Sequence, residues 1–394
     1  METRSAARKD IPMNYEVIVI GAGPAGSAAA RECARMGLST LCLEEHGTIG
    51  YPVQCAGLLS TAAFAECRVT SERAVLNKVS GARVHTGSGN ELLIDAKTTR
   101  AVVVDRGTLD RDMAEAAAND GAEFRLKTAV YDVRGTSVFT RGVNGQEEIG
   151  FDMLIAADGP RSSIARLYGM ERARTYLAGI QADMPGDSDP RYVRIYPDAS
   201  PEFFGWSIPT GPGRIRAGLC GRSQVMDRFT AFSKKFGSST SQVVTGTLPL
   251  GVMPRTYKNR TLFVGDAAGF PKPTSGGGIY TGIRSARHAA AVAAQACEQG
   301  VYDDTILAGY ERRWKEDFGR ELELGYRLFE MRQKMSAEDI DALVQALNTP
   351  SILRTIEESG DMDRPGALIK KLLVNSGVLR LIKPLLQAGL HSLF

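Results

Sequence analysis

The stretch Tyr15-Glu-Val-Ile-Val-Ile-Gly-Ala-Gly-Pro-Ala-Gly26 decides the fold. Its β-branched run predicts a strand that ends at Gly21, and Ser27–Met36 predicts a helix directly behind the last glycine. This strand–turn–helix order is the context of the dinucleotide fingerprint. Gly21 would make the tight turn, Gly23 would let the backbone approach a pyrophosphate, and Gly26 would let the helix pack on the strand. The phosphates would then lie against the helix N-terminus, whose unpaired N–H groups favour anions.

An acidic residue follows at the distance that the fingerprint requires. The apolar run Leu38–Leu43 predicts a second strand, and Glu44 comes directly after it, about 20 residues beyond the glycines. A carboxylate at this point accepts hydrogen bonds from a ribose. A glycine-rich turn without a ligand is the alternative interpretation, and the motif alone does not say which dinucleotide binds.

Two later segments favour FAD. Residues 152–159 and 259–269 each predict a strand that ends beside a carboxylate, Asp158 with Gly159 and Asp266 with Gly265. Open α/β sheets bind ligands at this edge. Asp266 would accept a hydrogen bond from a ribityl hydroxyl, and the N–H groups of Gly276–Gly278 would favour negative charge on a flavin. The order and spacing of these segments behind the fingerprint favour an FAD site over turns that occur there by chance.

Size and composition restrict the class of protein. A chain of 394 residues suggests two or three domains. The net charge of +3 is too small to indicate nucleic-acid binding. Since the chain has no apolar run of about 18 residues, we expect no membrane-spanning helix. The polar residues 1–13 lack a signal-peptide core, so we expect a cytoplasmic protein. The six cysteines form no Cys-x-x-Cys pair and the four histidines are scattered, so we expect no metal site.

Hydrophobic patterning predicts the other elements. We expect helices at 58–69, 108–119 and 278–299, a hairpin at 82–94, and strands at 101–106, 128–134 and 150–156. Strand-like alternation at 170–256, with a turn at 211–213, predicts an antiparallel sheet that forms the floor of a substrate cavity. Residues 302–394 are nearly all helical in pattern. Their end, Pro365–Phe394, is basic and amphipathic, which suits either an anionic membrane surface or a cap over the rest of the protein.

The chain resembles the flavoprotein reductases and monooxygenases of the para-hydroxybenzoate hydroxylase-type fold over about residues 14–300. The blocks that carry this resemblance are Gly21–Gly26 with Glu44, Asp105-Arg106 with Asp110, Ala157–Gly159 and Gly265–Gly278. Within this group it resembles the archaeal geranylgeranyl reductases (digeranylgeranylglycerophospholipid reductases). That narrower resemblance depends on Pro52-Val-Gln-Cys-Ala-Gly57, Pro201-Glu-Phe-Phe-Gly-Trp-Ser-Ile-Pro209 and Pro273-Thr-Ser-Gly-Gly-Gly278.

The resemblance implies an α/β fold in three parts behind an N-terminal tail, 1–13. These parts are a Rossmann-like FAD-binding domain (14–78, 101–165 and 257–297), an antiparallel-sheet substrate domain (79–100 and 166–256) and a C-terminal helical domain (298–394). It also implies which residues contact FAD: Gly21, Gly23, Ala25, Gly26, Glu44, Glu45, Cys55, Ala56, Arg106, Val130, Asp158, Gly159, Gly265, Asp266, Gly277, Gly278 and Ile279.

Three residues are implied as catalytic, namely Cys55, Phe204 and Trp206. In geranylgeranyl reductases the matching cysteine lies near the flavin ring, and reduction of an isolated C=C bond needs a hydride on one carbon and a proton on the other. A thiol there could donate the proton, and aromatic faces could stabilise a transient cation. The family's substrate motif has Tyr and Phe where this chain has Phe204 and Ile208. The motif implies substrate contacts from Pro201, Phe204, Trp206, Ile208 and Pro209. A free thiol that fills a turn and an ordinary aromatic core strand are the alternatives.

The function implied by the resemblance is FAD-dependent saturation of geranylgeranyl chains on archaeal ether lipids. Because the chain has no second nucleotide fingerprint, we expect electrons from a ferredoxin-like protein or from transient NAD(P)H contact. Peripheral membrane contact through the basic C-terminal stretch would suit such a substrate. Two other functions stay open: an aromatic-ring monooxygenase of the same fold, and a prenyl-binding carrier without catalysis.

Overall fold

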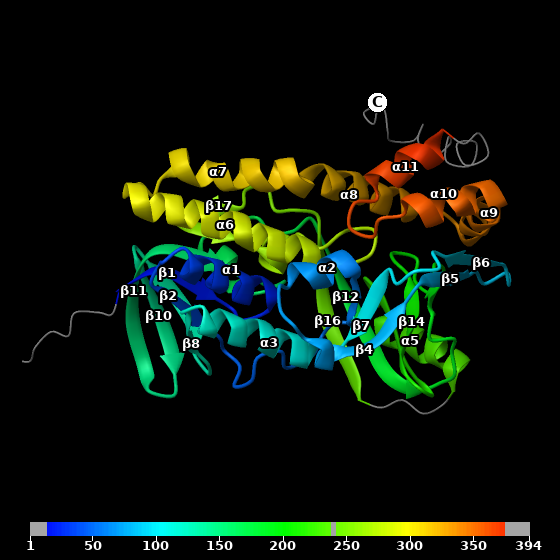
Figure 1. Ribbon diagram of the computed structural model, residues 1–394, viewed down its shortest axis with the longest axis horizontal. Helices are drawn as coiled ribbons and strands as arrows, with labels where there is room; N and C mark the ends of the chain where they lie inside the picture. The colour runs from blue at the N-terminus through cyan, green and yellow to red at the C-terminus, as the bar shows by residue number, and fades with distance from the viewer. Residues whose placement is uncertain (1–13, 238–241, 375–394) are drawn as a thin grey trace, which may run out of the picture.

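Five parallel strands form the centre of the largest sheet, at the left of Figure 1. The computed structural model describes residues 14–237 and 242–374. The parallel order is β8 (Glu123–Arg125), β2 (Thr40–Leu43), β1 (Asn14–Ile20), β11 (Gly145–Ala156) and β18 (Thr261–Phe263). The short strand β17 (Tyr257–Lys258) extends one edge. Strand β10 (Ser137–Gly142) pairs with the first half of β11, and β9 (Ala129–Arg134) pairs with β10.

The sequence of these strands explains their position. Residues 17–20 of β1, all of β2 and residues 153–156 of β11 are aliphatic or small and buried, as is typical of parallel strands covered on both faces. Helix α1 (Pro24–Arg35) packs between α3 (Arg106–Asn119) and α6 (Ile279–Gln299) on this sheet (Figure 1). The carboxyl ends of β1, β11 and β18 therefore meet at one edge, beside the start of α1.

A seven-stranded sheet forms the second layer, at the right of Figure 1. Its order is β16 (Val243–Leu250), β12 (Thr175–Pro185), β15 (Arg214–Gly221), β14 (Gly205–Gly211), β13 (Tyr192–Tyr196), β5 (Gly81–His85) and β6 (Glu91–Asp95). All neighbours are antiparallel except β13 and β5. Helix α5 (Val225–Ser233) covers one face of this sheet through Phe229 and Phe232. The other face is turned toward the three-stranded sheet of β3 (Leu58–Ser60), β7 (Ala101–Val104) and β4 (Val75–Val79).

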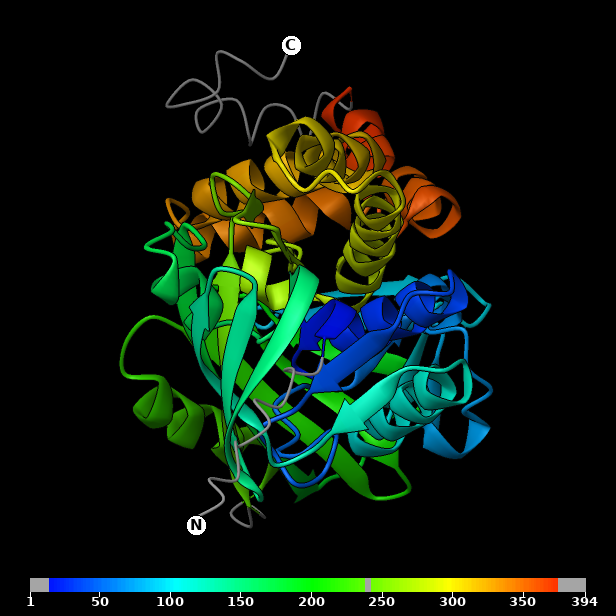
Figure 2. The same cartoon turned by 90° about the vertical axis from the view of Figure 1, so that its left-hand side faces the viewer.

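Helices form a third layer above the sheets in both views (Figure 2). After α6 the chain continues through α7 (Asp304–Trp314), a π-helical segment (Lys315–Gly319), α8 (Arg320–Arg332), α9 (Ala337–Leu347), α10 (Pro350–Ser359) and α11 (Gly366–Leu373). The short helices are α2 (Thr61–Glu66), α4 (Ser163–Leu167) and the 3₁₀ turns Glu72–Ala74, Lys234–Phe236 and Gly265–Ala268. In the part of the chain that the structure describes, no helix has both the length and the apolar character to cross a bilayer.

The structure confirms the expected α/β class and changes some element boundaries. The predicted helix 58–69 begins as strand β3, because Leu58–Ser60 pair with β7 and only Thr61 starts the helix that Ser60 caps. Arg106 lies in the first turn of α3 rather than in a strand, since Asp105 caps that helix. Helix α5 and strand β10 were not predicted. Lys370 and Lys371 of the basic C-terminal stretch lie on α11, while its residues 375–394 are outside the described residues.

Candidate flavin and substrate site

The turn between β1 and α1 leaves room for a ligand at one glycine only. Gly21 has φ +96°, and a Cβ there would lie 2.5 Å from the Ala157 carbonyl oxygen. A Cβ on Gly26 would lie 1.8 Å from the Gly21 oxygen. These two glycines are therefore required by the packing of β1, α1 and the end of β11. At Gly23, by contrast, no described atom lies within 4 Å of a Cβ, so the helix start is open where a pyrophosphate would approach.

Glu44 supports the loop that would hold the cofactor. Its Oε2 accepts a hydrogen bond of 2.8 Å from the Ala22 N–H, and its Oε1 accepts one of 2.9 Å from the His46 N–H. The carboxylate is nearly buried at the end of β2, while the neighbouring Glu45 is exposed. Because a carboxylate has about four acceptor sites, Glu44 retains capacity for a ribose hydroxyl.

Asp158 combines a structural bond with an unused acceptor. Its Oδ2 accepts from Ser163 Oγ and from the Ile164 N–H, both at 3.1 Å, and so fixes the start of α4. Its Oδ1 is buried and has no hydrogen-bond partner among the described residues. A buried acceptor without a donor is costly unless a bound group supplies one. This orphaned oxygen, together with the open Gly23, fits a hydroxyl-rich dinucleotide such as FAD.

Arg106 brings together three groups that are far apart in the sequence. Its Nε and Nη2 each donate to Asp110 at 2.9 Å, and its side chain is only 11% exposed. Burial opposes the charge, but Asp110 and Cys55 outweigh it and raise the pKa of the Arg106 guanidinium. Burial also raises the pKa of Asp266 to about 6, although Arg106 lowers it. A permanent cation thus lies beside Cys55 and acts on Asp266.

Polar groups of the seven-stranded sheet hold the turn that carries Cys55. Gln181 of β12 donates from Nε2 to the Cys55 oxygen at 3.0 Å, and Arg216 of β15 donates from Nη1 to the Ala56 oxygen at 3.1 Å. Arg216 is itself held by two bonds to Asp183. Gly57 has φ +76° and passes so close to β7 that a Cβ would lie 2.4 Å from the Val104 oxygen. The half-buried Cys55 is therefore fixed between the two sheets.

Sequence reasoning missed Gln181 and Arg216. The sequence did contain a signal. Gln181 lies between the buried residues Ile180 and Ala182 of β12, and Arg216 lies between the buried residues Ile215 and Ala217 of β15. Because successive side chains of a strand point to opposite faces, each polar side chain lies on the face opposite its apolar neighbours. Polar side chains on the inner face of a sheet need a buried partner. The alternation shows the face but does not identify that partner.

The glycine-rich loop, residues 269–278, lies between Asp266 and the seven-stranded sheet. A Cβ on Gly278 would lie 2.9 Å from Asp266 Oδ1, and one on Gly276 would lie 3.1 Å from Leu248. Helix α6 starts directly behind the loop at Ile279, and Ala25 of α1 lies against Gly265. The loop therefore connects the end of β18 with the seven-stranded sheet.

An aromatic cluster lies between this loop and the helical layer. Phe203 is stacked on Phe204 at 4.3 Å between ring centroids, and Phe204 meets Trp206 edge-on at 6.2 Å. Trp206 also packs with the cluster of Ile208 and Val79, which Ala56 contacts too. Its Nε1 is buried and has no hydrogen-bond partner among the described residues. The structure thus brings Trp206 and Phe204 to the Cys55 side of the sheet, and adds Phe203.

The other residues of the predicted substrate motif have structural contacts. Ile208 and Pro209 are buried, and the Pro209 oxygen accepts a hydrogen bond from Asn77. Pro201 is exposed, and its oxygen accepts one from Arg332 of α8. Val130 of β9, which was predicted to contact FAD, is partly buried against the core of the larger sheet.

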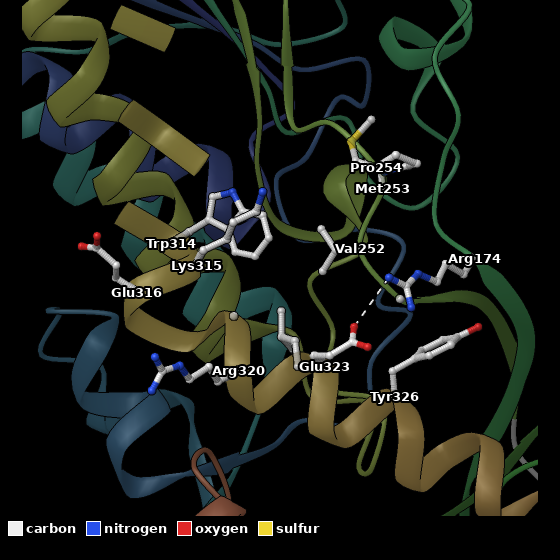
Figure 3. A pocket seen from close by; sticks show the side chains of 13 residues that line it. Arg174, Val252, Met253, Pro254, Trp314, Lys315, Glu316, Arg320, Glu323 and Tyr326 are labelled. Atoms are coloured by element: carbon white, nitrogen blue, oxygen red, sulfur yellow. Dashed lines mark ion pairs between the residues drawn. The ribbon is translucent and has the colours of Figure 1, made fainter. Parts of the chain in front are cut away.

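A separate cleft of about 790 Å³ is lined by none of the residues 269–278 (Figure 3). One wall is the segment Gly251–Pro254, and the other comes from the π-helical segment and α8. Arg174 pairs across it with Glu323 and lies over the ring of Tyr326, which also belongs to the core cluster of Phe203. Trp314, which also lines the cleft, donates from Nε1 to Thr256 Oγ1 at 3.0 Å.

Comparisons with known proteins agree with an FAD-binding fold. A family model described as an FAD binding domain matches residues 14–216. The chain is 33% identical over 354 residues to digeranylgeranylglycerophospholipid reductase 2 of Methanothermobacter thermautotrophicus, which covers 85% of this chain and 92% of the relative. The protein of the same name from Methanopyrus kandleri is 30% identical over 372 residues, covering 88% and 93%. A geranylgeranyl bacteriochlorophyll reductase-like structure from Thermoplasma acidophilum matches with a TM-score of 0.86 at 26% identity, covering 95% and 99%.

Proposed function

Because the chain belongs to the FAD-binding family that includes the digeranylgeranylglycerophospholipid reductases, we propose that it saturates C=C bonds in the geranylgeranyl chains of archaeal membrane ether lipids. It is an FAD-dependent oxidoreductase. The observation that carries the proposal is the meeting of the Cys55 turn with Trp206: Ala56 and Trp206 pack against one apolar cluster. The turn that carries the Cys55 thiol thus lies next to an apolar, aromatic surface.

In this proposal, different residues contribute to the addition of a hydride and a proton to the alkene. When bound and reduced, FAD supplies a hydride to one alkene carbon. The Cys55 thiol donates a proton to the other carbon, and water re-protonates the thiolate. Arg106, held by Asp110, faces the sulfur and balances the negative charge left on it. Phe204 and Trp206 exclude water and present aromatic faces to the cationic character that develops on the chain.

Other parts of the site have binding roles in this proposal. Gly23 and the α1 N-terminus bind the pyrophosphate, Glu44 binds a ribose, and Asp158 and Asp266 accept hydrogen bonds from FAD. The electron donor in the proposal is a ferredoxin-like protein or NAD(P)H. The basic C-terminal stretch would contact the membrane that holds the lipid.

An anaerobic assay tests the function. Protein loaded with FAD and reduced by dithionite is mixed with a digeranylgeranylglyceryl lipid, and product mass is followed by mass spectrometry. We expect mass gains in steps of two hydrogen atoms. Oxygen uptake with phenolic substrates would instead indicate an aromatic monooxygenase. Lipid binding by a colourless protein, unaffected by added FAD, would indicate a carrier. Absence of any mass gain with prenyl lipids would remove the reductase proposal.

A further inference from the structure

A buried ion pair ties the glycine-rich loop to a distant part of the chain. Lys272 Nζ lies 2.5 Å from Asp363 Oδ1 and donates to the Met362 oxygen at 2.8 Å. The other carboxylate oxygen of Asp363 accepts a hydrogen bond from Ser60, the cap of α2. The side chains of Lys272 and Asp363 are only 10% and 2% exposed. Both charges are therefore removed from water and depend on each other.

Lys272 also organises the loop through its backbone. Its N–H donates to the Gly277 oxygen at 3.1 Å, and its oxygen accepts from the Gly276 N–H at 2.8 Å. A Cβ on Gly277 would lie 3.1 Å from Lys272 Cε, so the lysine stem packs directly on that glycine. The position of Lys272 consequently sets the position of the Gly276–Gly278 backbone.

The partner segment, residues 360–366, joins α10 and α11 and reaches down toward α2 in Figure 1. It has further attachments that do not involve Lys272. Arg364 donates to Asp317 at 2.8 Å and to Tyr280 of α6 at 3.3 Å, and the Gly366 N–H donates to Glu321 at 2.8 Å. The Lys272 contact can therefore be removed separately from the attachments to the helical layer.

We propose that the Lys272–Asp363 pair is a positioning device that holds the glycine-rich loop in the geometry that binds FAD. If the segment leaves, Lys272 becomes an unpaired buried cation, and the loop must open to hydrate it. FAD binding and docking of the 360–366 segment are therefore coupled. Each stabilises the other by the same free energy, as linkage requires. The inference depends on FAD binding and not on which lipid is reduced.

Asp363→Asn tests the coupling. FAD affinity is measured by quenching of flavin fluorescence, and protection of residues 360–366 by hydrogen–deuterium exchange with and without FAD. In the unmodified protein, FAD should slow exchange in this segment. In Asp363→Asn the dissociation constant of FAD should rise roughly tenfold or more, and the FAD-dependent protection should disappear. Lys371→Met is the matched control, since it removes an exposed bond from α11 to Ser359 but no bond of residues 360–366, and it should leave FAD affinity within about twofold.

A double variant keeps the test decisive if the single variant folds poorly. Lys272→Met with Asp363→Leu replaces both charges by apolar groups of similar size. FAD affinity should be closer to that of the unmodified protein than in either single variant. The proposal would be overturned if the losses of FAD affinity caused by the two substitutions were additive in the double variant, or if Asp363→Asn left the FAD affinity unchanged. Protein that shows the coupling but reduces no lipid would refute only the proposed function.

Discussion

At the residue scale, Cys55 has surroundings unlike those of the buried cysteines. Burial raises the pKa of Cys67 and Cys220 to about 12, so both remain neutral thiols, whereas Cys55 is half-buried beside Arg106. If Cys55 donates the proton, Cys55→Ala should reduce turnover by about 100-fold, the usual scale of a lost general acid, with FAD still bound. Product mass and flavin absorbance measure the two effects. Cys297→Ser, at a half-buried thiol near Glu16, should keep full turnover. Undiminished turnover in Cys55→Ala would exclude the thiol as proton source.

Asp266 gives the FAD-free protein a specific pH dependence. Its pKa is about 6 in the folded protein against 3.8 for an ordinary aspartate side chain, so the folded state binds the proton more tightly. This group's contribution to the free energy of unfolding is therefore largest below pH 4 and is lost as the pH rises through 6, by up to about 3 kcal/mol. Asp266→Asn removes this loss. The FAD-free variant should be more stable than the unmodified protein at pH 7.5, with no such advantage at pH 4, in urea titrations. Equal stability at pH 7.5 would contradict the raised pKa.

At the element scale, the β1–α1 junction separates glycines needed for packing from one needed for the ligand. Gly26→Ala should cost about 3 kcal/mol or more, because its Cβ would overlap the Gly21 oxygen. Gly23→Ala has open space and φ −67°, so unfolding of the FAD-free protein should change by only about 0.5 kcal/mol. Its FAD dissociation constant should nevertheless rise about tenfold, because the methyl group occupies the pyrophosphate approach. Thermal unfolding and flavin fluorescence check the pair. If Gly26→Ala and Gly23→Ala changed the free energy of unfolding and the FAD dissociation constant by the same amounts, this distinction between the two glycines would be refuted.

Local patterns predicted the elements whose signal lies within one segment. The runs in β1, β2 and β11 are buried and aliphatic, and the Ala-rich α6 starts and ends nearly where expected. The segment at Leu58–Ser60 was predicted as helix because its strand identity comes from β7, more than 40 residues away. Helix α5 is set by packing of Phe229 and Phe232 on Ile180 and its neighbours, which the local sequence does not show.

The candidate site was predictable where a motif carried it. The glycines, Glu44, Asp158, Asp266 and Cys55 were all found, although which of them contact FAD or substrate stays a prediction. Gln181, Arg216 and Lys272 were not found. Each makes a long-range bond, to Cys55, Ala56 or Asp363, and no spacing in the sequence indicates such a bond. Asp183, another polar residue on the inner face of the sheet, was not found for the same reason.

At the scale of the whole molecule, the helical layer contacts the candidate site at two places. Lys272 and Asp363 connect it to the glycine-rich loop, and Arg332 at the end of α8 connects it to the substrate motif. The seven-stranded sheet supplies the opposite wall through Gln181 and Trp206. In these proposals, cofactor binding and substrate contact depend on elements from the whole length of the described chain, and the helices form part of the site.

Arg332 provides the test of this arrangement. Its guanidinium donates to the oxygens of Pro197, Ser200, Pro201 and Phe203, the loop that leads into Trp206. Burial lowers the pKa of Arg332, against the opposing effect of nearby carboxylates, so the bonds are made in a partly dry site. Arg332→Met leaves these oxygens without their donor, which frees the motif without touching the FAD loop.

The apparent KM for the prenyl lipid should therefore rise about tenfold in Arg332→Met, while the FAD dissociation constant stays within about twofold. Initial rates over a range of lipid concentrations and flavin fluorescence give the two numbers. Arg327→Met on the same helix, whose side chain pairs with Glu323 at the surface, is the matched control and should leave both unchanged. A loss of FAD affinity in Arg332→Met would show that α8 supports the cofactor instead of the substrate motif. An unchanged KM would show that the Pro197–Phe203 loop is held by its own packing, and that the helical layer acts only through Lys272.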